Sequence, residues 1–172
     1  MDSSYWSVTL ELPDAEATAR LALALKPHLS AGDTLLLSGP IGAGKSHFAR
    51  ALIGGFLADH DALEDIPSPT FTLVQTYFAG DLEIWHADLY RLSGVDEVFE
   101  LGLIDAFDAA ICVVEWPEKL GTEAPDNALS LEFQLTKAEE TRRLILSARA
   151  EKWCWVGPVL AEFLRSPEVA NG

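Results

Sequence analysis

Residues 39 to 46, GPIGAGKS, have the composition and spacing of a loop that binds phosphate groups. Gly39, Gly44, Lys45 and Ser46 occupy every fixed position of the pattern GxxxxGK[ST]. Glycines let the backbone curl so that consecutive N–H groups face a phosphate chain, and a following helix adds the positive end of its dipole. We therefore expect a nucleoside triphosphate here, with Lys45 at the β- and γ-phosphates and the Ser46 hydroxyl at Mg²⁺. An incidental glycine-rich turn is the alternative.

Two carboxylates are candidates for holding the metal and the attacking water. Asp88 follows the β-rich run LEIWHA, and Glu115 ends the apolar run AAICVV. A phosphate-bound Mg²⁺ usually also needs a carboxylate at the carboxyl end of a neighbouring strand. One of the two would position Mg²⁺ while the other orients the water, and the sequence does not assign them. Either could instead simply meet solvent at a strand end.

Three further side chains lie close to these segments in the sequence. Thr70, in SPTFT, follows the helix expected over 46–59. Many nucleotide-hydrolysing proteins place a loop that senses the γ-phosphate after this helix; a plain turn is the alternative. Trp116, after Glu115, suits a nucleotide-stacking or partner-facing surface, or else core packing. His86 lies two residues before Asp88, hence on the same strand face, where it could support a metal-binding side chain or simply pack.

The elements that must position these residues follow an alternating order. Apolar periodicity and capping residues predict strands at 5–12, 33–39, 70–78, 82–90, 109–116, 127–136 and 142–150, and helices at 12–29, 46–59, 95–108 and 155–166. Asp14 is placed to cap the first helix, and Pro27 lies near its end. The pattern predicts an α/β, P-loop NTPase-like fold with a mostly parallel central sheet, antiparallel edge strands and flanking helices. We expect residues 1–172 to form one domain.

Composition narrows the possible partners. The 172 residues carry 12 basic and 27 acidic side chains, a formal charge of −15, so the chain alone would be repelled by a nucleic-acid backbone. Neither a secretory signal nor a membrane-spanning apolar stretch is evident, which favours a soluble cytoplasmic protein. Cys112 and Cys154 have no metal-ligand spacing, and we expect both thiols to be reduced and buried.

Four segments between residues 39 and 120 resemble the bacterial TsaE (YjeE) family. GPIGAGKSHFAR is similar to its Walker A loop, SPTFTLVQTY to its switch segment, HADLYRL to its Walker B-like segment and EWPEKL to its glutamate–tryptophan signature. The resemblance implies an ATPase that is slow by itself and uses ATP and Mg²⁺. It also implies two partners, TsaB-like and TsaD-like proteins, which transfer a threonylcarbamoyl group to tRNA, so this chain would reach tRNA only through them.

The motif matches carry the family's functional residues onto this chain. Lys45, Asp88 and Glu115 would be catalytic, and the metal would meet Ser46, Thr70, Asp88 and Glu115. The resemblance implies nucleotide contacts at Gly39, Gly42, Ala43, Gly44, Lys45, Ser46, His47, Thr70 and Trp116. Pro40 and Ile41 replace a frequent acidic–leucine pair, and Ser46 and His47 replace a frequent pair of threonines, although serine keeps the metal-binding hydroxyl.

Other users of a phosphate-binding loop remain as alternatives. A small-molecule P-loop kinase normally has an arginine-bearing lid, but after Arg91 no basic residue follows until Lys119. A GTPase would show an NKxD-type guanine-reading segment, and none is present. A nucleotide-dependent scaffold, in which hydrolysis is incidental, shares all of these motifs.

Overall fold

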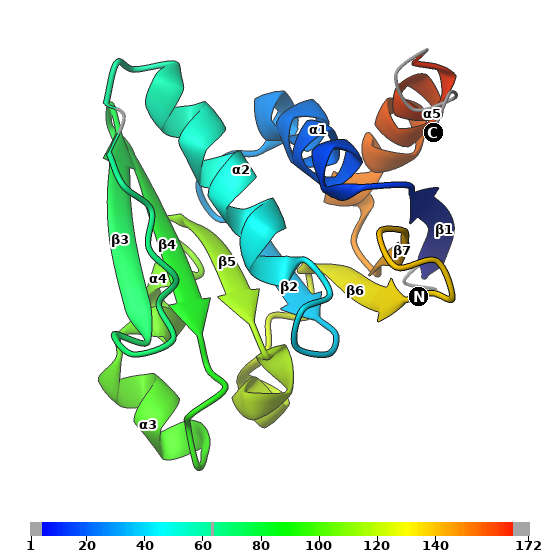
Figure 1. Ribbon diagram of the computed structural model, residues 1–172. Coiled ribbons are helices and arrows are strands. Elements are labelled where there is room, and N and C mark those ends of the chain that lie inside the picture. Colours follow the sequence, from blue (N-terminus) through cyan, green and yellow to red (C-terminus); the bar gives the residue numbers. More distant parts are fainter. Residues whose placement is uncertain (1–4, 63, 167–172) are drawn as a thin grey trace.

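The computed structural model describes residues 5–62 and 64–166, and its described strands form one sheet between two layers of helices (Figure 1). The strands are β1 (Trp6–Leu12), β2 (Thr34–Ser38), β3 (Val74–Ala79), β4 (Leu82–Asp88), β5 (Ile111–Glu115), β6 (Leu129–Leu135) and β7 (Arg142–Ala148). The α-helices are α1 (Ala15–Leu25), α2 (Lys45–Ala58), α3 (Val95–Glu100), α4 (Leu103–Ala106) and α5 (Val156–Arg165). Short 3₁₀ helices cover Lys26–His28, Pro117–Glu123 and Glu151–Trp153.

The sheet has a parallel centre and antiparallel edges. Its strand order is β1-β7-β6-β2-β5-β4-β3. Strands β6, β2, β5 and β4 run parallel to their neighbours in this order, whereas β3 pairs antiparallel with β4, and β7 pairs antiparallel with both β6 and β1. Every residue of β5 is buried, as expected for a central strand covered on both faces. The predicted α/β fold class is confirmed.

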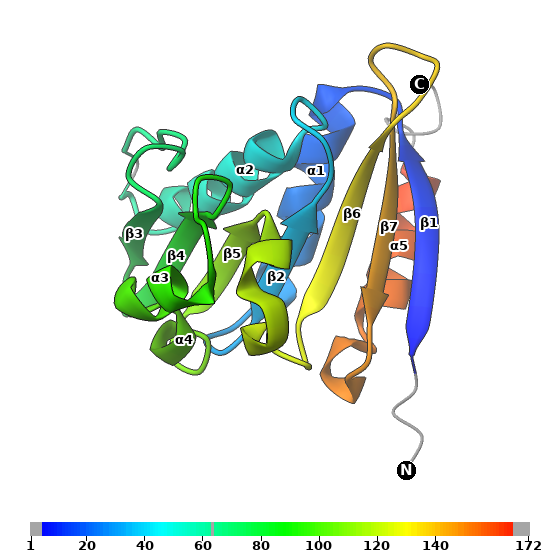
Figure 2. The same ribbon diagram turned by 90° about the horizontal axis from the view of Figure 1, so that it is seen from below.

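Helices cover the two faces of the sheet unequally. Helices α1, α2 and α5 pack on one face, and α3, α4 and the 3₁₀ helix Pro117–Glu123 lie on the other (Figure 2). Successive side chains of β2 therefore enter different cores: Leu35 and Leu37 face α1 and α2, whereas Leu36 faces the smaller core. On the outer strand β1, alternate residues such as Ser7 and Thr9 remain exposed.

Local signals at the first helix behave as predicted. The Asp14 carboxylate accepts a hydrogen bond from the backbone N–H of Ala17 at 2.8 Å, which satisfies one of the donors left free at a helix start. Helix α1 ends at Leu25, and Pro27 lies in the 3₁₀ turn that follows. Within the described residues, no helix has both the length and the apolar character needed to cross a membrane.

Three expectations from the sequence are wrong in detail. The helix predicted over 95–108 is two short helices, because Gly102 adopts a left-handed φ of 78° between α3 and α4. The strand predicted from residue 70 begins only at Val74, since Leu73 has a φ of 69° and ends a turn closed by its N–H to the Pro69 carbonyl. Both cysteines are free, but Cys154 is exposed.

Candidate nucleotide-binding site

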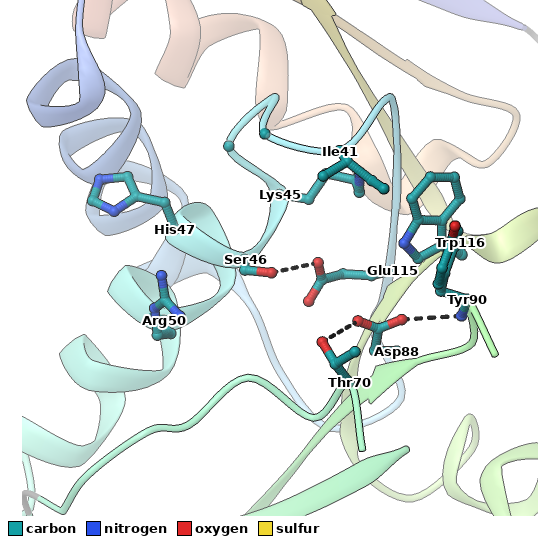
Figure 3. A pocket seen from close by; sticks show the side chains of 12 residues that line it. Ile41, Lys45, Ser46, His47, Arg50, Thr70, Asp88, Tyr90, Glu115 and Trp116 are labelled. Carbon is teal, nitrogen blue, oxygen red and sulfur yellow. Dashed lines mark hydrogen bonds between the residues drawn. The ribbon is translucent and has the colours of Figure 1, made fainter. Parts of the chain in front are cut away.

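A pocket of about 420 Å³ opens where β2, β4 and β5 reach their carboxyl ends and α2 begins (Figure 3). Ligands of open parallel sheets bind outside the carboxyl ends of the strands, so the position itself favours ligand binding. The pocket is lined by Ile41, Gly42, Gly44, Lys45, Ser46, His47, Arg50, Thr70, Asp88, Tyr90, Glu115 and Trp116.

The loop between β2 and α2 is curled by glycines with positive φ. Gly39, Gly42 and Gly44 have φ values of 137°, 82° and 106°. Gly39 is also crowded, because a Cβ there would lie 2.4 Å from the Phe133 carbonyl oxygen on the adjacent strand β6. The Lys45 ammonium donates to the carbonyls of Gly39 at 2.6 Å and Pro40 at 2.9 Å, so it ties the start of the loop to its end.

Lys45 is a buried cation within this loop. Lys45 is 5% exposed, and its ammonium lies 4.3 Å from the centre of the Trp116 ring. Burial lowers the pKa of Lys45, while the nearby carboxylates of Glu115, Glu118 and Asp88 act in the opposite direction. These acidic groups and the aromatic face stabilise a positive charge at the floor of the pocket.

Glu115 joins the loop to the sheet. Its Oε1 accepts a hydrogen bond from the Ser46 hydroxyl at 2.7 Å, and its Oε2 lies 2.6 Å from Nε2 of His86. Because β2 pairs directly with β5, the end of β5 lies beside the start of the loop. The hydroxyl predicted to reach a metal is thus in contact with one of the two candidate carboxylates.

Asp88 lies beside Glu115 and holds the segment around Thr70. The two residues are register partners on the parallel strands β4 and β5. Oδ2 of Asp88 accepts from the Thr70 hydroxyl at 3.2 Å, and Oδ1 accepts from the backbone N–H of Tyr90 at 3.0 Å. The Thr70 hydroxyl also lies 2.8 Å from that of Ser68. The segment around Thr70 is therefore attached to the second carboxylate, whereas Ser46 contacts the first (Figure 3).

Trp116 forms part of the rim in an unusual backbone conformation. Its φ of 60° and ψ of 53° are left-handed, which costs free energy for a residue with a side chain. Its N–H donates to the Leu37 carbonyl at 3.2 Å, and its ring lies 4.8 Å from that of Tyr90. These contacts hold the indole over Lys45, so Trp116 lines the pocket and also packs against the smaller core.

The oxygen donors of the pocket suit Mg²⁺ bound together with a nucleotide. Among the described residues, no group of three or more His, Cys, Asp or Glu side chains could hold a metal ion alone. Mg²⁺ in nucleotide sites usually takes one or two protein oxygens and completes its shell with phosphate oxygens and waters. Ser46, Thr70, Asp88 and Glu115 all line the pocket and offer such oxygens.

Two predicted contact residues stand apart from the pocket wall. Gly39 does not line it and contacts β6 instead, and the Ala43 side chain is fully buried in the larger core. His47 does line it, with Nε2 2.8 Å from the Ala15 carbonyl oxygen at the start of α1.

Sequence reasoning did not predict four residues that lie at the site, namely Ile41, Arg50 and Tyr90 in the pocket lining and Arg142 beside the loop. Arg50 lines the pocket, and its position four residues after Ser46 on α2 is the signal that could have identified it. Arg142, at the start of β7, donates to the Gly42 carbonyl at 3.3 Å. No local pattern in the sequence brings Arg142 to the loop.

Comparisons with known proteins agree on one family. The family model described as "Threonylcarbamoyl adenosine biosynthesis protein TsaE" matches residues 12–145. A protein of Rickettsia conorii named tRNA threonylcarbamoyladenosine biosynthesis protein TsaE is 41% identical over 107 residues, which are 62% of this chain and 59% of that protein. Proteins of the same name from Treponema pallidum and Bacillus subtilis are 32% and 34% identical, over 70% and 72% of this chain and 87% and 73% of theirs.

The matches differ in how much of each relative they span. The chain spans 59% and 62% of the length of the Rickettsia conorii and Rickettsia felis proteins. The crystal structure of Bacillus subtilis YdiB superposes with a TM-score of 0.68 at 24% identity, covering 94% of this chain and 97% of that one, which supports the fold. Because the family model and several relatives match most of the chain, the protein belongs to the TsaE family of threonylcarbamoyl adenosine biosynthesis proteins.

Proposed function

We propose that this protein binds ATP with Mg²⁺ and hydrolyses it as a component of tRNA threonylcarbamoyladenosine biosynthesis. One observation carries the proposal: a curled phosphate-binding loop, its buried lysine and a serine in contact with a carboxylate converge on a single pocket. The relatives named for this biosynthesis supply the biological setting.

Each group of the pocket has a task in this reaction. The N–H groups of the loop and the Lys45 ammonium would stabilise charge that develops on the transferred phosphate. Ser46, with Glu115, would face the metal side of the nucleotide, while Asp88 would hold Thr70 near the γ-phosphate. Mg²⁺, when bound, would neutralise charge on the phosphate oxygens. One carboxylate would orient the attacking water.

The proposed role is indirect with respect to tRNA. A chain with a net charge of −15 is poorly suited to hold a nucleic acid by itself. Partners similar to TsaB and TsaD would hold the tRNA and transfer the threonylcarbamoyl group, and ATP turnover in this protein would act on that complex. We propose that the chain works there as a single P-loop domain in the cytoplasm.

Replacing Lys45 by alanine tests the ATPase proposal. Hydrolysis measured as phosphate release, with TsaB- and TsaD-like partners present, should fall at least on the order of 100-fold, as expected when a preorganised charge at the transition state is lost. Lys137→Ala makes the same change on the exposed β6–β7 loop and should leave the rate unaltered. Hydrolysis that survives Lys45→Ala would refute the proposal.

A pull-down tests the partnership separately. Tagged protein, incubated with purified TsaB- and TsaD-like proteins in the presence and absence of ATP, should retain both of them, with the nucleotide changing the amount retained. If neither protein is retained under either condition, the partnership is wrong, whatever the ATPase assay gives.

A further inference from the structure

His86 is a polar side chain buried in the larger core. It lies in the middle of β4 and is 0% exposed. Its neighbour on the same face, Ile84, is apolar and fully buried, and its register partner on β5 is Val113, also fully buried. An apolar residue would be the ordinary occupant of this position, because burying a polar ring costs free energy unless its nitrogens are hydrogen-bonded.

One ring nitrogen of His86 is used and the other is not. Nε2 lies 2.6 Å from Oε2 of Glu115, and a carboxylate can only accept, so Nε2 carries the proton and donates. Nδ1 is buried without a hydrogen-bond partner among the described residues. The histidine is thus incompletely satisfied, and its single strong contact is with a residue of the pocket.

Glu115 is held at both ends by these contacts. Glu115 is 2% exposed. Its Oε2 accepts a hydrogen bond from His86, and its Oε1 accepts one from the Ser46 hydroxyl. Without His86, Oε2 would lose its donor in an apolar surrounding, and the carboxylate could rotate about its last bond, since such torsions are broad. The oxygen that faces Ser46 and the nucleotide side would then no longer be fixed.

We propose that His86 is a positioning residue, which locks the carboxylate of Glu115 in the orientation that ATP hydrolysis requires. The proposal rests on the ATPase function proposed above. It separates two tasks: Lys45 and the loop bind nucleotide, whereas the His86–Glu115 pair sets the geometry of a group that acts during hydrolysis. Loss of the pair should therefore lower kcat and leave nucleotide affinity nearly unchanged.

The hydrogen bond itself can be tested in the protein without nucleotide. Proton–nitrogen NMR of the histidine rings should show His86 as the tautomer protonated at Nε2, with a slowly exchanging, downfield N–H resonance that disappears in His86→Gln. In Glu115→Gln this resonance should move upfield, because a neutral amide oxygen accepts less strongly than a carboxylate. A His86 ring protonated only at Nδ1 would overturn the proposal.

Two substitutions separate positioning from packing. His86→Leu fills the space and removes the donor, whereas His86→Gln places an amide N–H close to the position of Nε2. We expect kcat to fall by about 10- to 100-fold in His86→Leu, the usual cost of losing a residue that orients a site group, and to recover most of that loss in His86→Gln. Thermal unfolding identifies a temperature at which both variants are folded, and His60→Leu, at an exposed histidine, controls for the substitution.

Nucleotide affinity completes the test. Calorimetric titration with ADP in the absence of Mg²⁺ should give His86→Leu the wild-type affinity within about threefold. The proposal fails if His86→Leu turns over like the wild type, if both substitutions impair turnover equally, or if affinity falls in parallel with kcat. Absence of hydrolysis in the wild type with its partners would instead refute the ATPase function, and the NMR experiment would still decide whether the pair exists.

Discussion

Replacing Gly39 by alanine should destabilise the protein although Gly39 does not line the pocket. A Cβ at this position would lie 2.4 Å from the carbonyl oxygen and 3.1 Å from the Cβ of Phe133, and the backbone has a φ of 137°. The backbone conformation alone costs alanine about 1–3 kcal/mol. Relief of the clash must shift β6 away from β2, at the cost of one or two ladder hydrogen bonds of about 1 kcal/mol each. The free energy of unfolding should therefore fall by about 2–5 kcal/mol.

Urea denaturation with Gly42→Ala as the matched control would measure this effect. Gly42 has a φ of 82°, but a Cβ there would have no atom within 4 Å, so only the backbone cost of about 1–2 kcal/mol applies. For a chain of this length, the Gly39→Ala loss corresponds to a melting temperature lower by roughly 4–20 °C. The reasoning is refuted if both substitutions cost the same, because the contact with β6 would then contribute nothing. Nucleotide affinity should show the opposite order: Gly42→Ala should lower it more than Gly39→Ala does, because Gly42 lines the pocket and Gly39 does not.

Three further substitutions test other parts of the structure. Asp14→Ala should lower the free energy of unfolding by about 1 kcal/mol in urea, since it removes the cap of α1; no change would mean that water replaces the cap. Burial raises the pKa of Cys112 from 9.0 to about 12, so the folded protein keeps a proton that the unfolded chain loses, and the contribution of this thiol to the free energy of unfolding should fall by about 1.4 kcal/mol per pH unit between these values. Cys112→Val should make that decline shallower by the same amount, and an unchanged slope would contradict the assignment. Arg142→Met keeps the aliphatic part of the side chain but removes the hydrogen bond to the Gly42 carbonyl, and calorimetry should show nucleotide affinity about 3- to 10-fold weaker. Equal affinity would mean that this hydrogen bond does not help to hold the loop in its binding conformation.

The central strands could be predicted because their signals are local. Residues 35–37 and 111–114 are continuous apolar runs, which is typical of parallel strands covered on both faces, and their strands β2 and β5 lie in the middle of the sheet. The curled loop between β2 and α2 could be predicted for the same reason. Its glycines, lysine and serine lie within one short segment whose spacing by itself determines the shape of the backbone.

The errors arise where a single residue outweighs a local pattern. Residues 95–108 have helical periodicity, and a glycine within such a pattern is often tolerated, but Gly102 takes a left-handed φ and divides the segment. Threonine and phenylalanine at 70–72 favour a strand by propensity, whereas the structure uses them in the turn that brings Thr70 to Asp88. The contact with Asp88 depends on tertiary structure, which propensity does not report.

Residues distant in sequence meet at the site for reasons that only strand order and register provide. The sequence offers Asp88 and Glu115 as equivalent carboxylates at two strand ends, and nothing local distinguishes them. Because β5 lies between β2 and β4, Glu115 is next to the loop and Asp88 is one strand further away. Ser46 accordingly contacts Glu115, and Asp88 contacts Thr70.

The same sheet geometry explains why His86 contacts Glu115 rather than Asp88. Residues 86 and 88 point to the same face of β4, and Glu115 is the register partner of Asp88, so His86 reaches Glu115 diagonally from the strand interior. The sequence supports the shared face of His86 and Asp88 but favours neither carboxylate as the histidine's partner. A slip of β4 by one residue against β5 would turn both side chains to the opposite face and separate them from Glu115. The pairing of β4 with β5 thus fixes the arrangement on which hydrolysis is proposed to depend, whereas the loop residues proposed to bind nucleotide do not depend on that pairing.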